Sequence, residues 1–143
     1  MVSLFDAKTE HDVIQALKRG ENINQIRRGI TPLYTACEKG NVEVVDALLN
    51  HGANPHVLTH AEIIGPIQIA ALNGYVNIIK RLIRVGISIN NCLNRGGTLL
   101  YYASMLGHID VIDFLISHGA DVNFLSYPGT ALMAACYYDC RQI

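Results

Sequence analysis

A period of about 33 residues constrains this chain more than any other feature of its sequence. Blocks of similar character begin at Thr31, Gly65, Thr98 and Thr130, which are 34, 33 and 32 residues apart. A fixed period of this length indicates a repeated structural unit, and neighbouring units must stack because a single unit cannot bury its own apolar face. The chain is therefore expected to form a solenoid. The blocks are Thr31–Ala36, Gly65–Ala70, Thr98–Ala103 and Thr130–Ala135.

The start of each block carries residues that favour the beginning of a helix. Thr31, Thr98 and Thr130 can each accept a hydrogen bond from a backbone N–H of the first helical turn. Pro32 and Pro66 suit the first helical position, because an N–H at that position has no partner within the helix. A helix is therefore predicted to begin at each block.

Glycines divide each unit into two short helices. One set follows about nine residues after the block begins and predicts a left-handed turn that ends the first helix. A second set closes the unit, and aliphatic residues recur between the two sets at helical spacing. Because such short helices are marginal alone, we expect these aliphatic residues to fill the layers between stacked units. The first set is Gly40, Gly74 and Gly107, and the second is Gly20, Gly52, Gly86 and Gly119. The aliphatic residues are Val42, Val44, Val45, Leu48 and Leu49, then Val76, Ile78, Ile79, Leu82 and Ile83, then Ile109, Val111, Ile112, Leu115 and Ile116.

This unit resembles the ankyrin repeat, whose signature runs T-P-L-H-x-A, then glycine, then an apolar helix, then G-A-D-V-N. Gly119–Asn123 matches the last part in full, and Gly52–Pro55 and Gly86–Asn90 match it in part. The resemblance implies an all-α ankyrin-repeat solenoid of stacked helix-turn-helix units with finger-like β-turn loops. It runs from about residue 5 to the end, so 1–143 is interpreted as a single domain. The expected units are an N-terminal capping partial repeat at 1–25, full repeats at 26–58, 59–92 and 93–125, and a truncated repeat at 126–143.

Departures from the family pattern are also informative. The first unit retains Val13, Ile14 and Leu17 of the second-helix pattern but lacks the opening block, which is typical of a capping repeat. The finger at 57–64 carries an extra residue and is expected to be irregular. The family's histidine after T-P-L is absent, so the hydrogen bonds that it often makes to neighbouring loops are expected to be missing or remade. The residues at that position are Tyr34, Gln68, Tyr101 and Met133.

Charge and hydropathy argue against several classes of partner. The 143 residues include 11 basic and 12 acidic ones, a net charge of −1, so no whole-chain field attracts nucleic acid. No run of about 18 apolar residues occurs, so membrane insertion is not expected. The four cysteines lack the dense framework of a small secreted domain and are interpreted as reduced thiols, which predicts a cytoplasmic or nuclear location. They are Cys37, Cys92, Cys136 and Cys140.

The sequence carries no signature of catalysis, metal binding or cofactor binding. It has no nucleophile elbow of the form G-x-S-x-G and no phosphate loop of the form G-x-x-x-x-G-K-[ST]. Cys136 and Cys140 are four residues apart, but no second pair accompanies them, whereas structural zinc needs four ligands. His51 and His118 suit helix ends, and His108 stands where the family usually has histidine. We therefore predict that the chain is no enzyme and holds no metal or cofactor.

The resemblance implies that side chains at the finger tips and at the ends of the first helices line a concave groove, which binds a partner protein or peptide. The expected groove is charged at the first full repeat and apolar and aromatic at the last two. Tyr, Met and Arg are enriched among interface anchors, which supports this interpretation. The expected partner-binding residues are the finger positions Arg27, Arg28, Ile30, Glu62, Ile64, Asn94, Arg95 and Tyr127, and the helix positions Glu38, Lys39, Leu72, Asn73, Met105, Leu106, Tyr137 and Tyr138.

Alternatives to this interpretation stay open. The apolar residues of the last two units can instead pack on one another or on later repeats, and the paired arginines can be simple solvated charges. For the chain as a whole, the leading hypothesis is a protein-interaction module without catalysis of its own. The alternative is the targeting or substrate-recruiting region of a larger multidomain enzyme or adaptor, because the fold alone does not fix the function.

The last unit restarts the first-helix pattern at Thr130, but only 141–143 remain for its second helix. We therefore expect that the chain is cut short of its natural end and that its last helix opens most easily, because stability in a solenoid is approximately a sum over neighbouring units. Exposed apolar side chains at this end are expected to support weak self-association at high concentration.

The absence of a ligand set yields a first prediction. A chelator should leave the thermal midpoint of unfolding unchanged, because no metal contributes to the folded state. Thermal unfolding with and without EDTA, together with metal analysis of the purified protein, checks this. A midpoint lowered by several degrees, or stoichiometric zinc, would show that Cys136 and Cys140 belong to a metal site.

Overall fold

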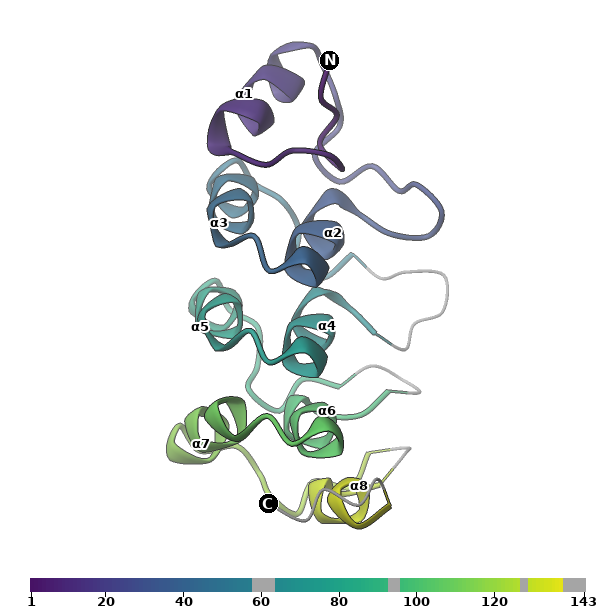
Figure 1. The fold of residues 1–143 in the computed structure, drawn as a ribbon, viewed down its shortest axis with the longest axis vertical. Helices are drawn as coiled ribbons and strands as arrows, with labels where there is room; N and C mark the ends of the chain where they lie inside the picture. Colours follow the sequence, from purple (N-terminus) through teal and green to yellow (C-terminus); the bar gives the residue numbers. More distant parts are fainter. Residues whose placement is uncertain (58–63, 93–95, 127–128, 138–143) are drawn as a thin grey trace.

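The computed structural model describes residues 1–57, 64–92, 96–126 and 129–137, and for Tyr137 only the backbone. Within these ranges the chain forms eight α-helices in two rows that run along one long axis (Figure 1). The arrangement confirms the expected all-α solenoid. The first-helix row consists of α2 (Pro32–Lys39), α4 (Pro66–Asn73), α6 (Leu99–Leu106) and α8 (Ala131–Tyr137), and the second-helix row consists of α1 (Glu10–Lys18), α3 (Val42–Asn50), α5 (Val76–Arg84) and α7 (Ile109–Ser117).

The predicted threonine caps are confirmed. Thr31 Oγ1 accepts a hydrogen bond from the Tyr34 N–H at 3.2 Å, and Thr98 Oγ1 accepts one from the Tyr101 N–H at 3.1 Å. Thr130 Oγ1 is 3.3 Å from Met133 N in the same arrangement. These bonds satisfy N–H groups of the first turn that have no partner within the helix, which is why each first helix begins where it does.

α4 begins without a threonine, and a glutamine in its first turn bonds back to the residue that precedes the helix. Gln68 stands at the position of the family's histidine and is 1% exposed. Its Oε1 accepts a hydrogen bond from Gly65 N–H at 3.1 Å, and its Nε2 donates to Asn91 Oδ1 in the next finger. The link from this position to a neighbouring loop is therefore remade by an amide in the second full repeat.

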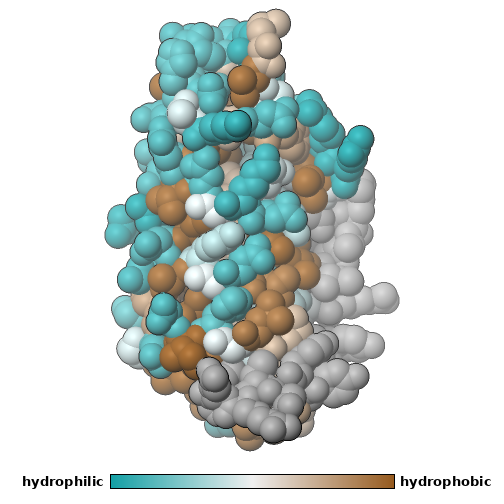
Figure 2. Space-filling model, in the orientation of Figure 1, coloured by the Kyte–Doolittle hydropathy of each residue, from teal (hydrophilic) through white to brown (hydrophobic). Residues whose placement is uncertain are grey.

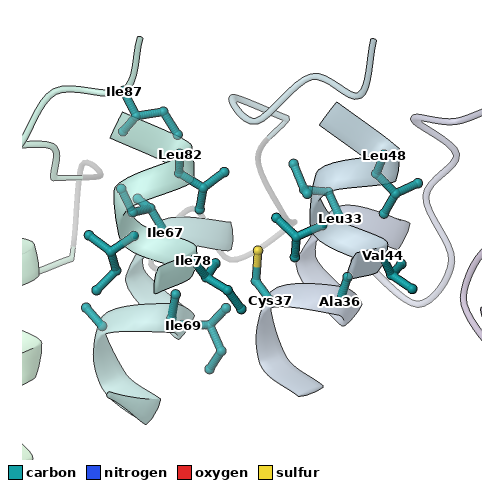
Figure 3. Packing of buried hydrophobic residues seen from close by; sticks show 14 of the residues in the cluster. Leu33, Ala36, Cys37, Val44, Leu48, Ile67, Ile69, Ile78, Leu82 and Ile87 are labelled. Carbon is teal, nitrogen blue, oxygen red and sulfur yellow. The ribbon is translucent and has the colours of Figure 1, made fainter. Parts of the chain in front are cut away.

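The core consists of layers of aliphatic side chains between neighbouring helix pairs. Figure 3 shows Leu33 and Cys37 on one pair facing Ile69 and Ile78 on the next, with the Cys37 sulfur in the space between them. Cys37 is fully buried, and this burial raises the pKa of its thiol well above the usual range. Each full second helix contributes three buried aliphatic residues to these layers: Val44, Val45 and Leu48, then Ile78, Ile79 and Leu82, then Val111, Ile112 and Leu115.

Two expected core residues are exposed, so that part of the prediction is wrong. Ile109 is 39% exposed and Ile116 is 49% exposed, although both belong to the aliphatic pattern of α7. In α3 and α5 the equivalent side chains are half-buried and pack against the core, and each of these two helices contacts the next second helix along the row. No further second helix follows α7 in the described part of the chain, so these two isoleucines keep their contact with solvent.

The N-terminal segment covers the first end of the stack. Leu4 is 1% exposed and Phe5 is 8% exposed. The Leu4 N–H donates to Glu21 Oε2 at 3.0 Å, and this bond holds the pKa of the Glu21 carboxyl below its usual value. Lys39 Nζ of α2 donates to the Phe5 carbonyl at 3.3 Å. The segment is therefore tied both to the loop that follows α1 and to α2.

Polar contacts link neighbouring units at two levels of the stack. His108 Nε2 lies 2.6 Å from Leu72 O, so this histidine joins the turn before α7 to the end of α4. On the finger side, Asn24 Oδ1 accepts from Asn54 N–H and Asn90 Oδ1 accepts from Asp121 N–H, each at 2.8 Å. The two asparagine bonds occur at equivalent positions two repeats apart, and all three contacts join neighbouring units.

The other two histidines of the pattern bind helix carbonyls, as expected. His51 Nδ1 lies 2.8 Å from Ala47 O, and His118 Nδ1 lies 2.8 Å from Phe114 O. Each ring nitrogen therefore adds a second contact to a carbonyl that already accepts a hydrogen bond from the backbone N–H of the same histidine.

Two glycines at the same repeat position give a second prediction. Gly74 (φ 79°) and Gly107 (φ 71°) both end a first helix in the left-handed region. A Cβ on Gly74 would lie 2.7 Å from His108 Nδ1, whereas a Cβ on Gly107 would meet nothing within 4 Å. Gly107→Ala should cost about 1 kcal/mol of backbone strain, and Gly74→Ala should cost at least about 2 kcal/mol, because the alanine also displaces the histidine.

Urea unfolding of both variants measures the difference. Adding His108→Ala to Gly74→Ala should remove part of the extra cost, because the clash is lost. Equal destabilisation by Gly74→Ala and Gly107→Ala would show that His108 does not pack on this turn.

Candidate protein-binding surface

The first finger is a hairpin with two arginines near its tip. Arg27 N–H donates to Ile30 O at 2.9 Å, and Ile30 N–H donates to Arg27 O at 3.1 Å. Arg28 (φ 54°) and Gly29 (φ 82°), between them, both lie in the left-handed region. This is the backbone of a type I′ hairpin turn, where glycine and asparagine are the usual residues. Arginine in this conformation costs roughly 1–2 kcal/mol.

The two arginines differ in how they are held. The Arg27 guanidinium carbon lies 4.6 Å from the centroid of the Phe5 ring, a cation–π contact with the N-terminal segment. Arg27 and Arg28 are both exposed. Ile30, which ends the hairpin, is half-buried. The first finger therefore presents two cationic groups, one of which is fixed by an aromatic ring.

The last residues of the first helices occupy one repeat position with three different roles. Lys39 bonds to the Phe5 carbonyl, and Asn73 Nδ2 donates to the Glu38 carbonyl of the preceding helix at 3.2 Å. Both predicted binding residues therefore link neighbouring units. Leu106 cannot form such a bond, and it is 52% exposed. Of these three, Leu106 is the one that offers apolar area to a partner.

The preceding helix position is partly used by the core. Glu38 is exposed, and its charge adds to the effect of burial in raising the pKa of the Tyr34 hydroxyl. Leu72 and Met105 are half-buried and pack against the core, as does Ile64 in the second finger. Truncating these apolar residues would disturb the fold, so they are poor probes of binding.

Several predicted residues cannot be placed on this surface. Tyr137 lies in α8, and its side chain is outside the description. The expected irregular part of the second finger lies outside the described residues. So do the remaining predicted binding residues, which are Glu62, Asn94, Arg95, Tyr127 and Tyr138.

A cavity of about 170 Å³ lies between the second finger and the start of α4. Gln68 is the buried polar side chain in its lining, and both ends of its amide are hydrogen-bonded. The cavity is lined by Pro55, His56, Gly65, Pro66, Ile67, Gln68, Ile87 and Asn91.

In the parts of the chain that the structure covers, no three His, Cys, Asp or Glu side chains gather in a way that could hold a metal ion. No helix there has the length and apolar character needed to cross a membrane.

Exposed apolar residues concentrate at the end of the stack that carries α7 and α8. Figure 2 shows mostly hydrophilic residues around α1 and more hydrophobic ones toward the opposite end. The sequence pattern predicted apolar residues at this end of the groove and exposed apolar side chains on the last unit. It did not predict the exposure of Ile109 and Ile116, which it assigned to the core. The exposed residues at this end are Leu106, Ile109, Ile116, Val122, Leu125, Leu132 and Met133.

Comparison with known proteins identifies the fold family. The model of ankyrin repeats in three copies matches residues 4–90 and 67–143, which together cover nearly the whole chain. The chain therefore belongs to the ankyrin repeat family. Ankyrin repeats are generally protein–protein interaction modules and form a non-catalytic interaction fold.

The relatives are larger proteins of different kinds. The chain is 26% identical to a putative ankyrin repeat protein of Acanthamoeba polyphaga mimivirus, over 71% of this chain and 14% of that protein. It is 29% identical to the transient receptor potential cation channel subfamily A member 1 of Drosophila melanogaster, over 68% of this chain and 8% of the channel. It is 31% identical to NF-kappa-B inhibitor alpha of Gallus gallus, over 71% of this chain and 34% of the inhibitor. The chain thus spans about a third or less of these relatives.

The strained finger gives a third prediction. Arg28→Asn should raise the free energy of unfolding by up to about 1 kcal/mol, because asparagine tolerates the left-handed conformation better than arginine. Arg84→Asn is the matched control: it removes the same charge from the last turn of α5 and should be neutral or slightly destabilising. Urea unfolding of both variants measures the effect. Lower stability of Arg28→Asn would mean that the arginine side chain supports the fold.

Proposed function

We propose that this chain binds a segment of another protein along a concave groove formed by the finger hairpins and the ends of the first helices. The observation that carries the proposal is Arg28. A residue whose backbone conformation disfavours arginine is kept at an exposed finger tip, and strain of this kind is usually retained where the side chain is used. Arg27 beside it is already oriented by Phe5, so the tip loses little freedom on binding.

The two ends of this surface define the chemistry of the bound segment. The first finger carries exposed guanidinium groups, which suit carboxylates because they can donate two parallel hydrogen bonds. Leu106, two units further along, offers exposed apolar area where earlier units have Lys39 and Asn73. A segment with an acidic end and an apolar anchor matches both features.

A second candidate function is recognition on behalf of a larger protein. The matched region makes up between 6% and 34% of the length of the relatives. In those proteins the matching repeats are therefore one part of a longer polypeptide. This favours the alternative that these repeats recruit a target for an activity located elsewhere. Both candidates use the same groove, and they differ in what is joined to it.

Peptide display on the full chain tests the groove. Peptides selected for binding should combine acidic residues with an apolar anchor, and the double variant Arg27→Ala, Arg28→Ala should slow their association about tenfold and weaken its salt dependence. Leu106→Ser should mainly speed dissociation, because an apolar contact is lost. Surface plasmon resonance at two salt concentrations separates the two effects.

The control is a change of the same kind on the opposite row. Lys80→Ala with Arg84→Ala removes two exposed cationic side chains from α5 and should leave binding unchanged. If the finger and Leu106 variants bind the selected peptides as well as the unmodified chain does, while circular dichroism shows them folded, the groove is not the binding surface.

A further inference from the structure

One repeat position is apolar and buried in the earlier first helices but exposed in the last one. Leu33, Ile67 and Leu100 occupy this position in successive first helices and are 1%, 2% and 4% exposed. Leu132 occupies it in α8 and is 73% exposed. In the three earlier pairs, α3, α5 and α7 pack on α2, α4 and α6, whereas no second helix lies beside α8 in the described residues.

α7 has lost its cover on the adjoining side. Ile109 and Ile116 are exposed, whereas their counterparts in α3 and α5 pack against the core. α5 covers this side of α3, and α7 covers this side of α5. Figure 1 shows α7 and α8 at the same end of the stack, with α8 continuing the first-helix row. We call the surface formed by Ile109, Ile116 and Leu132 the terminal corner, because a single helix placed there would contact both α7 and α8.

The rest of the fold shows what kind of helix occupies the equivalent places. α3, α5 and α7 have nine residues each and bury aliphatic side chains at the first, second and fifth positions of a five-residue stretch. All nine of these side chains are at most 6% exposed. An occupant of the terminal corner therefore needs the same aliphatic spacing. The stretches are Val44–Leu48, Ile78–Leu82 and Val111–Leu115.

Contacts between neighbouring second helices also specify a charge. Arg81 Nε of α5 lies 2.6 Å from Asp46 Oδ1 of α3. Lys80 is the counterpart of Asp46 in α5, and its Nζ lies 5.3 Å from the ring centroid of Phe114, the counterpart of Arg81 in α7. In both layers, therefore, the position held by Asp46 and Lys80 on one second helix faces the position held by Arg81 and Phe114 on the next. Asp113 is the counterpart of Asp46 in α7, and it is exposed.

We propose that the terminal corner binds an amphipathic helix of a partner polypeptide with the pattern aliphatic, aliphatic, any residue, arginine, aliphatic. The aliphatic residues cover Ile109, Ile116 and Leu132, and the arginine pairs with Asp113 as Arg81 pairs with Asp46. This site lies at the end of the stack and does not depend on the finger groove. α5 itself carries the pattern, as I-I-K-R-L at 78–82, so its sequence is a suitable probe.

The test joins this probe to the intact protein. A copy of residues 75–86 is attached after Ile143 through a Gly/Ser linker of about 20 residues, which raises the effective concentration of the helix without fixing its register. Amide exchange of α7 and α8 should slow at least about tenfold, and the thermal midpoint should rise. The aliphatic control carries Ile78→Ser, Ile79→Ser and Leu82→Ser in the attached copy, and both effects should vanish.

A charge exchange tests the pairing with Asp113. Asp113→Arg should reduce the protection gained from the attached copy about threefold or more, and Arg81→Asp within that copy should restore it. The double variant Arg27→Ala, Arg28→Ala should leave this protection unchanged, so a failure of the groove proposal and a failure of this one give different results.

Three outcomes would overturn the proposal. The first is that the attached copy leaves the amide exchange of α7 and α8 unchanged. The second is that the unmodified chain already protects both helices as strongly as α4 and α5, which would mean that it covers the terminal corner itself. The third is that light scattering of the unmodified chain shows a dimer that Ile116→Asp dissociates, which would assign the terminal corner to a second copy.

Discussion

Burial of aliphatic side chains between neighbouring helix pairs is the interaction on which the rest of this structure depends. Each helix has seven to nine residues, too few for stability in isolation. Leu48, Leu82 and Leu115 are each fully buried against the adjoining helices. Because every layer is formed with the next unit along, both the placement of the fingers and the exposure of the last helices follow from how many neighbours a unit has.

The repeat architecture could be predicted from the sequence, because its determinants are local. Thr31 and Thr98 cap helices through atoms three residues away, and a fixed glycine spacing sets the length of each helix. The exposure of Ile109 and Ile116 could not be predicted in this way, because it depends on a neighbour and not on the helix itself. The same aliphatic spacing gives a half-buried residue in the middle of the stack and an exposed one at its end.

The candidate groove was predictable only in outline. Family position correctly pointed to Arg28 and Leu106 as exposed residues. It did not reveal that Lys39 and Asn73 bond to the preceding unit, because the acceptors are backbone carbonyls 34 and 35 residues away. The left-handed conformation of Arg28 was also not visible from residue type, since asparagine or glycine is expected there. Position in a repeat therefore indicates where a side chain lies, and the contacts decide whether it is available.

The thiol of Cys37 can report on the transient opening of this stack. Its sulfur lies between the first and second full helix pairs, and it is shielded from solvent as long as these two pairs stay together (Figure 3). Cys92 and Cys136 are more accessible, so a thiol reagent should modify them first. The slower rate of alkylation at Cys37 would then measure how often the two helix pairs separate. One native side chain thus allows the opening of a single interface to be timed without adding a label to the protein.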